Sequence, residues 1–311
     1  MKPIYLAVLA IIFSYACNRK INNTNGANGA NRSGRTNNTT NTTYLDTRGN
    51  PMLLGTHPAE DLEQPPYGDW FNKNYADYSV DSVTANQLTP LLKGKTFELY
   101  LGTWCGDSKR EIPRMLKILR YAGVHPSQIK MVMLDSHDSL YKQSPAHEEK
   151  GKNIFRVPDL LVYSHNSEMN RIVEYPVGSL EKDLLLIARG DAYTPSYPGA
   201  AYLLQLLKER PATALMADKE NVVAFMKTKA KSDMDLNGLG YTWMYAGETD
   251  KAMLAFQLNV ALYPAVPNVY DSLGDLYRRL NNKAEARKYY QKVLELQPAN
   301  ASSAKKLAAL D

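Results

Sequence analysis

Residues 97–123 read FELYLGTWCGDSKREIPRMLKILRYAG, and this stretch indicates the fold more clearly than any other part of the chain. It begins with a short apolar run, residues 97–104, which is rich in strand-forming residues and ends at Cys105. From Ser108 to Tyr121 the apolar residues follow helical spacing, and Gly123 is placed to terminate the helix. The stretch therefore predicts a buried strand that leads directly into an amphipathic helix.

The segments that follow extend this pattern. Residues 129–134 are a second short apolar run, and a strand, a helix and a strand in this order predict a parallel βαβ unit with a right-handed crossover. Two further strand-like runs, residues 159–163 and 171–175, are linked through Ser-His-Asn-Ser and predict a hairpin. Ser179 is a suitable N-cap for a helix over residues 180–188. The predicted order is strand, helix, strand, hairpin, helix.

Two motifs within this order carry the chemistry. The first is Trp104-Cys105-Gly106-Asp107-Ser108-Lys109, with Pro113 eight positions after the cysteine, and the second is Val-Pro-Asp-Leu-Leu at residues 157–161. The first motif resembles the thioredoxin active site, in which a Trp-Cys-Gly-Pro-Cys-Lys run opens a helix that is kinked by a proline at this spacing. The second resembles the segment around the cis-proline of that family. Together they imply an α/β thioredoxin-like sandwich over residues 51–198.

The position of Cys105 suggests a nucleophile. A sulfur at the first turn of a helix lies near unpaired backbone N–H groups and the positive end of the helix dipole, which favours the thiolate that attacks disulfides. The resemblance implies that Pro158 is cis and presents a backbone edge beside the sulfur, where a substrate peptide can pair. It also implies that Trp104 and Pro158 form the substrate wall, and that Ser108 donates a hydrogen bond to the thiolate.

Departures from the family motif limit this chemistry. Ser108 stands where the family has its resolving cysteine, so a mixed disulfide at Cys105 would persist until another thiol releases it. Asp107 adds a negative charge that opposes the thiolate, and Leu99 occupies the place of the family's buried acidic residue. The alternative is that Cys105 is a small buried residue in a fold that no longer carries out chemistry.

The C-terminal third shows a different period. Residues 34 positions apart match in size and type: Gly240 with Gly274, Ala252 with Ala286, Phe256 with Tyr290, and Pro264 with Pro298. This period is typical of helix-turn-helix repeats and resembles tetratricopeptide repeats at residues 233–266 and 267–300. Because such repeats bury their faces only by stacking, we expect an all-α helical-repeat domain over residues 199–311, with residues 301–310 as its capping helix.

The repeat resemblance also implies a groove. In that family the first helix of each repeat lines the concave side, which implies contact positions for a protein or peptide partner at Asn237, Tyr241, Asp271, Asp275 and Arg278. The alternative for the aromatic residues of these helices is that they fill the core.

The N-terminus resembles that of an exported lipoprotein. Lys2 is followed by an apolar stretch over residues 4–13, which is too short to span a bilayer and predicts a signal peptide over residues 1–16. Ser-Tyr-Ala before Cys17 resembles a lipobox, which implies lipidation of Cys17 and, without a following Asp, an outer-membrane anchor facing the periplasm. Cleavage by an ordinary signal peptidase is the alternative. Residues 17–50 are mostly Asn, Thr and Gly and predict a disordered tether.

Composition excludes several classes of function. The net charge is only +5 and the basic residues are scattered, so no nucleic-acid partner is expected. The His and acidic residues at 137–138 and 147–149 lack the spacing of ligand pairs, so neither a metal nor another cofactor is expected.

With Cys17 lipidated, Cys105 is the sole free thiol. We therefore expect a membrane-anchored monothiol protein that acts on disulfides or oxidised thiols of envelope proteins. The alternative is a non-catalytic envelope scaffold.

Overall fold

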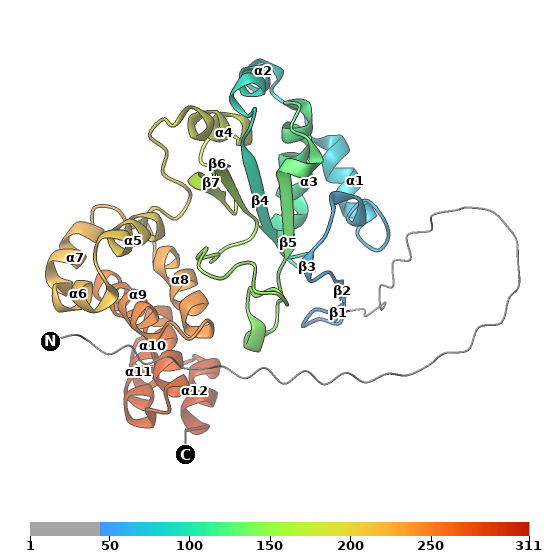
Figure 1. Ribbon diagram of the computed structural model, residues 1–311. Helices are drawn as coiled ribbons and strands as arrows, with labels where there is room; N and C mark the ends of the chain where they lie inside the picture. Colours follow the sequence, from blue (N-terminus) through green and yellow to red (C-terminus); the bar gives the residue numbers. More distant parts are fainter. Residues whose placement is uncertain (1–43, 311) are drawn as a thin grey trace, which may run out of the picture. The chain divides into compact units, whose positions relative to one another are not determined.

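The computed structural model describes residues 44–310, in which an α/β region is followed by a helical region (Figure 1). The elements of the α/β region are β1 (Tyr44–Leu45), β2 (Pro51–Met52), β3 (Gly55–Thr56), α1 (Gly68–Asp77), α2 (Ser82–Leu91), β4 (Thr96–Leu101), α3 (Gly106–Tyr121), β5 (Ile129–Met133), β6 (Asp159–Ser164), β7 (Ser167–Val173) and α4 (Leu180–Arg189). The predicted signal peptide and Cys17 lie outside the described residues.

A short hairpin begins the described chain. β1 pairs antiparallel with β2, and the Asp46 carboxylate closes the turn by accepting the backbone N–H groups of Arg48 and Asn50, both at 2.8 Å. The tether predicted for residues 17–50 is therefore too long at its C-terminal end, because these bonds hold residues 44–50 in place.

The central sheet has five strands in the order β3-β5-β4-β6-β7. β4 and β5 are parallel, with Phe97 opposite Ile129 and Leu101 opposite Met133, whereas the other neighbouring strands are antiparallel. Helix α3 connects β4 to β5, which confirms the predicted parallel βαβ unit.

β6 and β7 form the predicted hairpin, but with a tighter turn. His165 and Asn166 both have positive φ, 51° and 62°, as a two-residue hairpin turn requires. β7 therefore begins at Ser167, and the predicted start at Arg171 is wrong. β7 is an outer strand of the sheet, and its first four residues, Ser-Glu-Met-Asn, are exposed or half-buried. These residues therefore lack the apolar pattern that marks a buried strand in the sequence.

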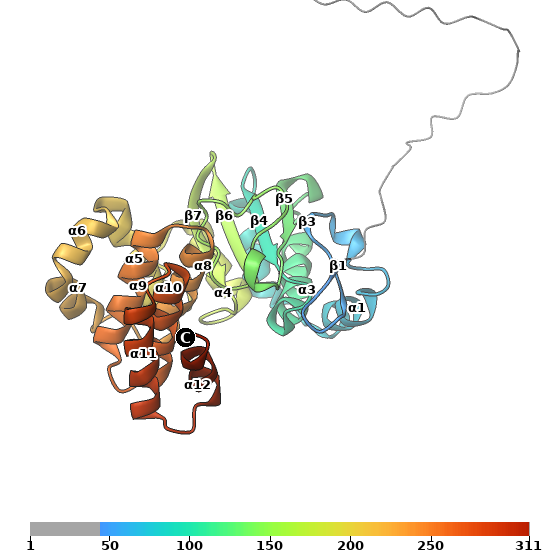
Figure 2. The same ribbon diagram turned by 90° about the horizontal axis from the view of Figure 1, so that it is seen from below.

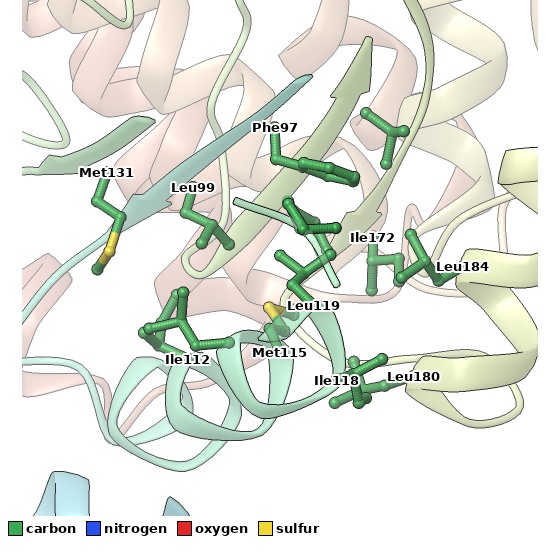
Figure 3. Packing of buried hydrophobic residues seen from close by; sticks show 14 of the residues in the cluster. Phe97, Leu99, Ile112, Met115, Ile118, Leu119, Met131, Ile172, Leu180 and Leu184 are labelled. Carbon is green, nitrogen blue, oxygen red and sulfur yellow. The ribbon is translucent and has the colours of Figure 1, made fainter. Parts of the chain in front are cut away.

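Helices α1 to α4 pack through one hydrophobic cluster, which they share with one face of the sheet (Figure 2). From β4 this cluster takes Phe97, Leu99 and Leu101, which alternate along the strand. Figure 3 shows Ile112 and Met115 of α3 on the side of β4 from which Phe97 and Leu99 project. β4 and α3, which both contribute side chains to this cluster, thus flank Cys105 on either side in the chain.

The other face of the sheet is covered by a loop. Tyr100, Val132 and Leu161 pack there against Ile154 and Val157, which belong to the long connection between β5 and β6. Its regular structure is one turn of 3-10 helix, Asp138–Leu140. This β5–β6 loop, residues 134–158, also carries the segment that contacts Cys105.

Residues 45–95 have weak hydrophobic periodicity in the sequence but form regular elements. They contain α1, α2 and the edge strand β3, and Asp81 caps α2 by accepting the N–H groups of Val83 and Thr84. The periodicity is faint because each helix buries few residues: α1 buries only Gly68 and Phe71.

The helical region consists of α5 (Pro198–Glu209), α6 (Ala212–Ala217), α7 (Lys219–Met226), α8 (Met234–Tyr245), α9 (Thr249–Leu262), α10 (Pro267–Arg279), α11 (Lys283–Leu296) and α12 (Ala301–Ala308). The pairs α8–α9 and α10–α11 repeat with the predicted 34-residue offset. A Cβ atom on Gly240 would lie 2.3 Å from the Phe256 ring, and one on Gly274 would lie 2.6 Å from the Tyr290 ring. Both glycines therefore permit close packing of the two helices of a pair.

Replacing Gly240 with valine is expected to lower the free energy of unfolding by about 1–3 kcal/mol. Phe256 is fully buried, so its ring has no room to yield to the new side chain. Urea denaturation measures the change. Gly106→Val is the control, because a Cβ at Gly106 meets no atom within 4 Å. An equal effect of the two substitutions would contradict the packing argument.

Candidate functional site

Cys105 is the N-cap residue of α3 and is half-buried. Its backbone is extended, with φ −86° and ψ 128°, and its carbonyl oxygen accepts the Lys109 N–H at 3.0 Å. The thiol donates to the carbonyl oxygen of Val157 at 3.3 Å. The Val157–Pro158 peptide bond is cis. The structure therefore brings together the two motifs that lie more than fifty residues apart in the chain.

Trp104 is fixed beside the cysteine by its own contacts. The indole N–H donates to the Leu134 carbonyl oxygen at 2.8 Å. The ring also lies against Gly102, where an added Cβ would be 2.4 Å away. Trp104 is half-buried, and it packs with Cys105 at the margin of the cluster beneath the β5–β6 loop.

Ser108 lies deeper than expected. It is fully buried, and its hydroxyl oxygen accepts the Gly102 N–H at 3.2 Å. Among the hydrogen bonds of residues 44–310, none joins Ser108 to Cys105. The predicted hydrogen bond from the Ser108 hydroxyl to the Cys105 sulfur is therefore not formed in this structure. Asp107, one residue earlier, forms an ion pair of 2.7 Å with Arg110, which offsets its charge near the sulfur.

A buried lysine in the β5–β6 loop is the main feature that the sequence does not predict. Lys142 is only 4% exposed and has a positive φ of 53°. Its ammonium group donates to the Tyr141 hydroxyl. Burial, and after it the charge of Arg156, lower the pKa of Lys142 to about 7, while the charges of Cys105 and Glu174 act in the opposite direction. The sequence gives no periodicity or motif in this loop that would reveal it.

Arg156 and Glu174 complete the surroundings of Lys142. Arg156 stacks on the Tyr197 ring at 4.7 Å and lies 3.9 Å from the Glu174 carboxylate. Its buried Nε atom has no hydrogen-bond partner in the described part of the chain. The Tyr197 hydroxyl donates to Glu174, and burial raises the pKa of Tyr197.

Asp159, directly after Pro158, forms a buried ion pair with Arg171. The distance is 3.0 Å, and Arg171 also donates to Glu168 and to the Lys152 carbonyl oxygen. Burial raises the pKa of Asp159 to about 7, although Arg171 opposes this. The second oxygen of Asp159 has no partner among the described residues. The ion pair therefore joins the first residue of β6, directly after the cis-proline, to β7.

The predicted partner-binding residues largely bond to one another and to α12. Tyr241 donates to Asp275 at 2.8 Å, and Lys306 of α12 donates to Asp271 and Asp275 at 2.6 and 2.8 Å. Asn237 is buried, whereas the Arg278 side chain is 56% exposed. Of the five residues, Arg278 therefore offers the most accessible polar group, and the two carboxylates mainly hold the capping helix.

A cleft of about 620 Å³ lies beside the outer strand β7, where Arg171, Tyr193 and Gln205 contribute to its walls. Neither Cys105 nor Lys142 lines this cleft, so its volume does not describe the cysteine site.

Over residues 44–310, no group of three or more His, Cys, Asp or Glu side chains could hold a metal ion. His137 pairs instead with Asp135 at 2.6 Å, and Ser144 donates to Glu148 at 2.6 Å. None of the helices in this part of the chain has the length and apolar character that crossing a membrane requires.

Comparison with known proteins finds a family match for one pair of helices in the helical region. Residues 267–300, which comprise α10 and α11, match the tetratricopeptide repeat family. No curated protein shows significant similarity to the chain. The repeat supports binding of a protein partner, and the match covers the second of the two predicted repeats.

Proposed function

We propose that the α/β region is a thioredoxin-like domain in which Cys105 captures protein disulfides or oxidised thiols. The observation that carries the proposal is the contact of 3.3 Å between the Cys105 thiol and the Val157 carbonyl, next to the cis-proline and at the start of α3. A cysteine in this position combines access from solvent with backbone groups to which an extended peptide can bond.

The proposed reaction needs one thiol from this chain. The Cys105 thiolate attacks one sulfur of a client disulfide, a mixed disulfide forms, and the other client sulfur leaves as a thiolate. Ser108 cannot displace the client, so a second thiol on the client or an external thiol completes an isomerisation or a reduction. The helical-repeat region recruits the protein partner, and a lipid on Cys17 holds the protein at the outer membrane, facing the periplasm.

Capture of a disulfide probe tests the proposal. The wild-type protein, incubated with a peptide that contains a disulfide, is expected to form an adduct that reductant removes, and Cys105→Ser is expected to form none. Cys17→Ser is the matched control and should retain the adduct. Equal adduct formation by wild type and Cys105→Ser, or none by either, would contradict the proposal.

A non-catalytic envelope scaffold is the second candidate, and the match to a tetratricopeptide repeat favours it. A scaffold predicts that partners are retained from cell envelopes by Cys105→Ser as well as by wild type. It also predicts that Arg278→Ala weakens their retention, because the Arg278 side chain is exposed on the helical region.

A further inference from the structure

Three residues on one stripe of α8 lie against the end of the β5–β6 loop. Met234, Gly238 and Thr242 are four positions apart, so they share one face of the helix. The Met234 carbonyl oxygen accepts the Arg156 guanidinium at 3.5 Å, and the Thr242 hydroxyl donates to the Ile154 carbonyl oxygen at 3.3 Å. This stripe of the first predicted repeat is therefore occupied by a segment of the same chain.

Gly238 allows the loop backbone to approach α8 closely. A Cβ atom on Gly238 would lie 3.1 Å from the Phe155 ring and 3.2 Å from the Phe155 carbonyl oxygen. Gly238 is not among the glycines with positive φ, so its backbone conformation does not require glycine. Because glycine destabilises the interior of a helix relative to alanine, the close approach to the loop is the structural reason for it here.

The segment that α8 contacts leads directly into the cysteine site. Residues 153–156 precede Val157, whose carbonyl oxygen accepts the Cys105 thiol, and the cis-proline Pro158. Residues 153–157 form no backbone–backbone hydrogen bond within the described part of the chain. Side chains from neighbouring elements therefore hold this segment in place.

Packing against the sheet does not by itself orient this backbone. Ile154 and Val157 make apolar contacts there, which are not directional, whereas hydrogen bonds are. On the α8 side, the Thr242 hydroxyl donates to the Ile154 carbonyl oxygen, and the Trp243 indole N–H donates to the Asn153 side chain at 2.9 Å. The orientation of the peptide groups before Val157 therefore depends on α8.

We propose that α8 positions the Val157–Pro158 segment for capture of the client, with Gly238 and Thr242 as positioning residues. The inference rests on the proposed function, in which an extended peptide bonds to the backbone beside Cys105. It gives the helical region a role in the reaction besides recruitment of a partner. Gly238 and Thr242 act through the loop: while α8 holds residues 153–156, the backbone beside the sulfur keeps the place that the client needs.

Capture of the disulfide peptide by Cys17→Ser protein, in which Cys105 is the sole thiol, tests the inference. Thr242→Val is expected to slow capture about fivefold, because it removes a hydrogen bond to the loop. Thr242→Ser keeps a hydroxyl and should capture at the rate of the parent protein. Thr228→Val is the matched control, since the Thr228 hydroxyl donates to the Phe225 carbonyl oxygen at 2.8 Å within the helical region.

Gly238→Val should have a larger effect, because it drives the loop backbone away from α8, and is expected to slow capture about tenfold. Iodoacetamide needs no backbone partner, so its reaction with Cys105 should not slow in either variant. This comparison separates displacement of the loop from a loss of thiol reactivity. Circular dichroism shows whether each variant is folded, and if Gly238→Val is not, the two Thr242 variants decide.

Equal capture by the parent protein and folded Thr242→Val would overturn the inference and leave the proposed function standing. The same conclusion follows if Thr242→Val and Thr228→Val slow capture equally, or if alkylation of Thr242→Val slows as much as capture does. If the parent protein captures no peptide, the proposed function fails, and the inference with it.

Discussion

Replacing Trp243 with alanine is expected to lower the free energy of unfolding by about 3–5 kcal/mol. Trp243 lies in α8 and is fully buried. It belongs to the cluster that contains Phe155 of the β5–β6 loop and Leu203 of α5. Its indole N–H also donates to the Asn153 side chain at 2.9 Å. The substitution therefore removes apolar contacts and a hydrogen bond that together join the loop to the helical region.

Urea denaturation followed by circular dichroism measures this effect. Trp243→Phe is the control, because it keeps an aromatic ring and loses the indole N–H, and its expected cost is about 1–2 kcal/mol. A cost for alanine no larger than that for phenylalanine would show that the ring contributes little to holding the two regions together.

Replacing Arg171 with methionine is expected to cost about 3–5 kcal/mol at alkaline pH, because it leaves the Asp159 carboxylate buried without a cation. The Asp159 side chain is fully buried, and that of Arg171 is 10% exposed. Measured between pH 6 and 9, the loss should grow as the pH rises above about 7, because Asp159 of the folded parent protein ionises there and the variant has no cation to pair with it.

The sign follows from the pKa of Asp159. Burial raises that pKa to about 7 from the ordinary value of 3.8, so the folded protein binds a proton that the unfolded chain has released in this window. The contribution to stability is present at low pH and is lost as pH rises through about 7. Removing Arg171 withdraws the cation that opposes this loss. In the double variant Asp159→Asn, Arg171→Met the buried carboxylate at residue 159 is absent, so most of the pH dependence should vanish. A cost for Arg171→Met that is the same at low and high pH would contradict this account.

Local patterns made much of the fold predictable. The run that ends at Cys105 and the helical spacing after Ser108 indicate a strand and a helix, because each depends on residues close together in the chain. The 34-residue offset between Gly240 and Gly274 similarly reflects one contact, between a glycine and an aromatic ring, made twice. The start of β7 was not predictable, because an outer strand needs no apolar alternation.

The candidate site was predictable only where a motif marks it. Cys105 and Pro158 are marked by their neighbours in the chain. Lys142 is not, because its burial depends on how an irregular loop folds over the sheet. The local sequence Tyr-Lys-Gln at residues 141–143 is typical of a solvent-exposed turn and does not indicate a buried lysine. For the same reason the bonds from Lys306 to Asp271 and Asp275 could not be foreseen, since they depend on the placement of α12.

The β5–β6 loop is fastened on two sides within the part of the chain that the structure describes. Ile154 and Val157 pack against the sheet, whereas Phe155 lies in the cluster of the helical region and the Asn153 side chain accepts the Trp243 indole N–H. A local opening that frees the carbonyl of Val157 must therefore break contacts with both regions at once. Backbone amides of residues 153–157 should exchange with solvent deuterium later than those of residues 145–151, which are mostly exposed in the same loop, so the wall beside Cys105 is the firm part of the loop.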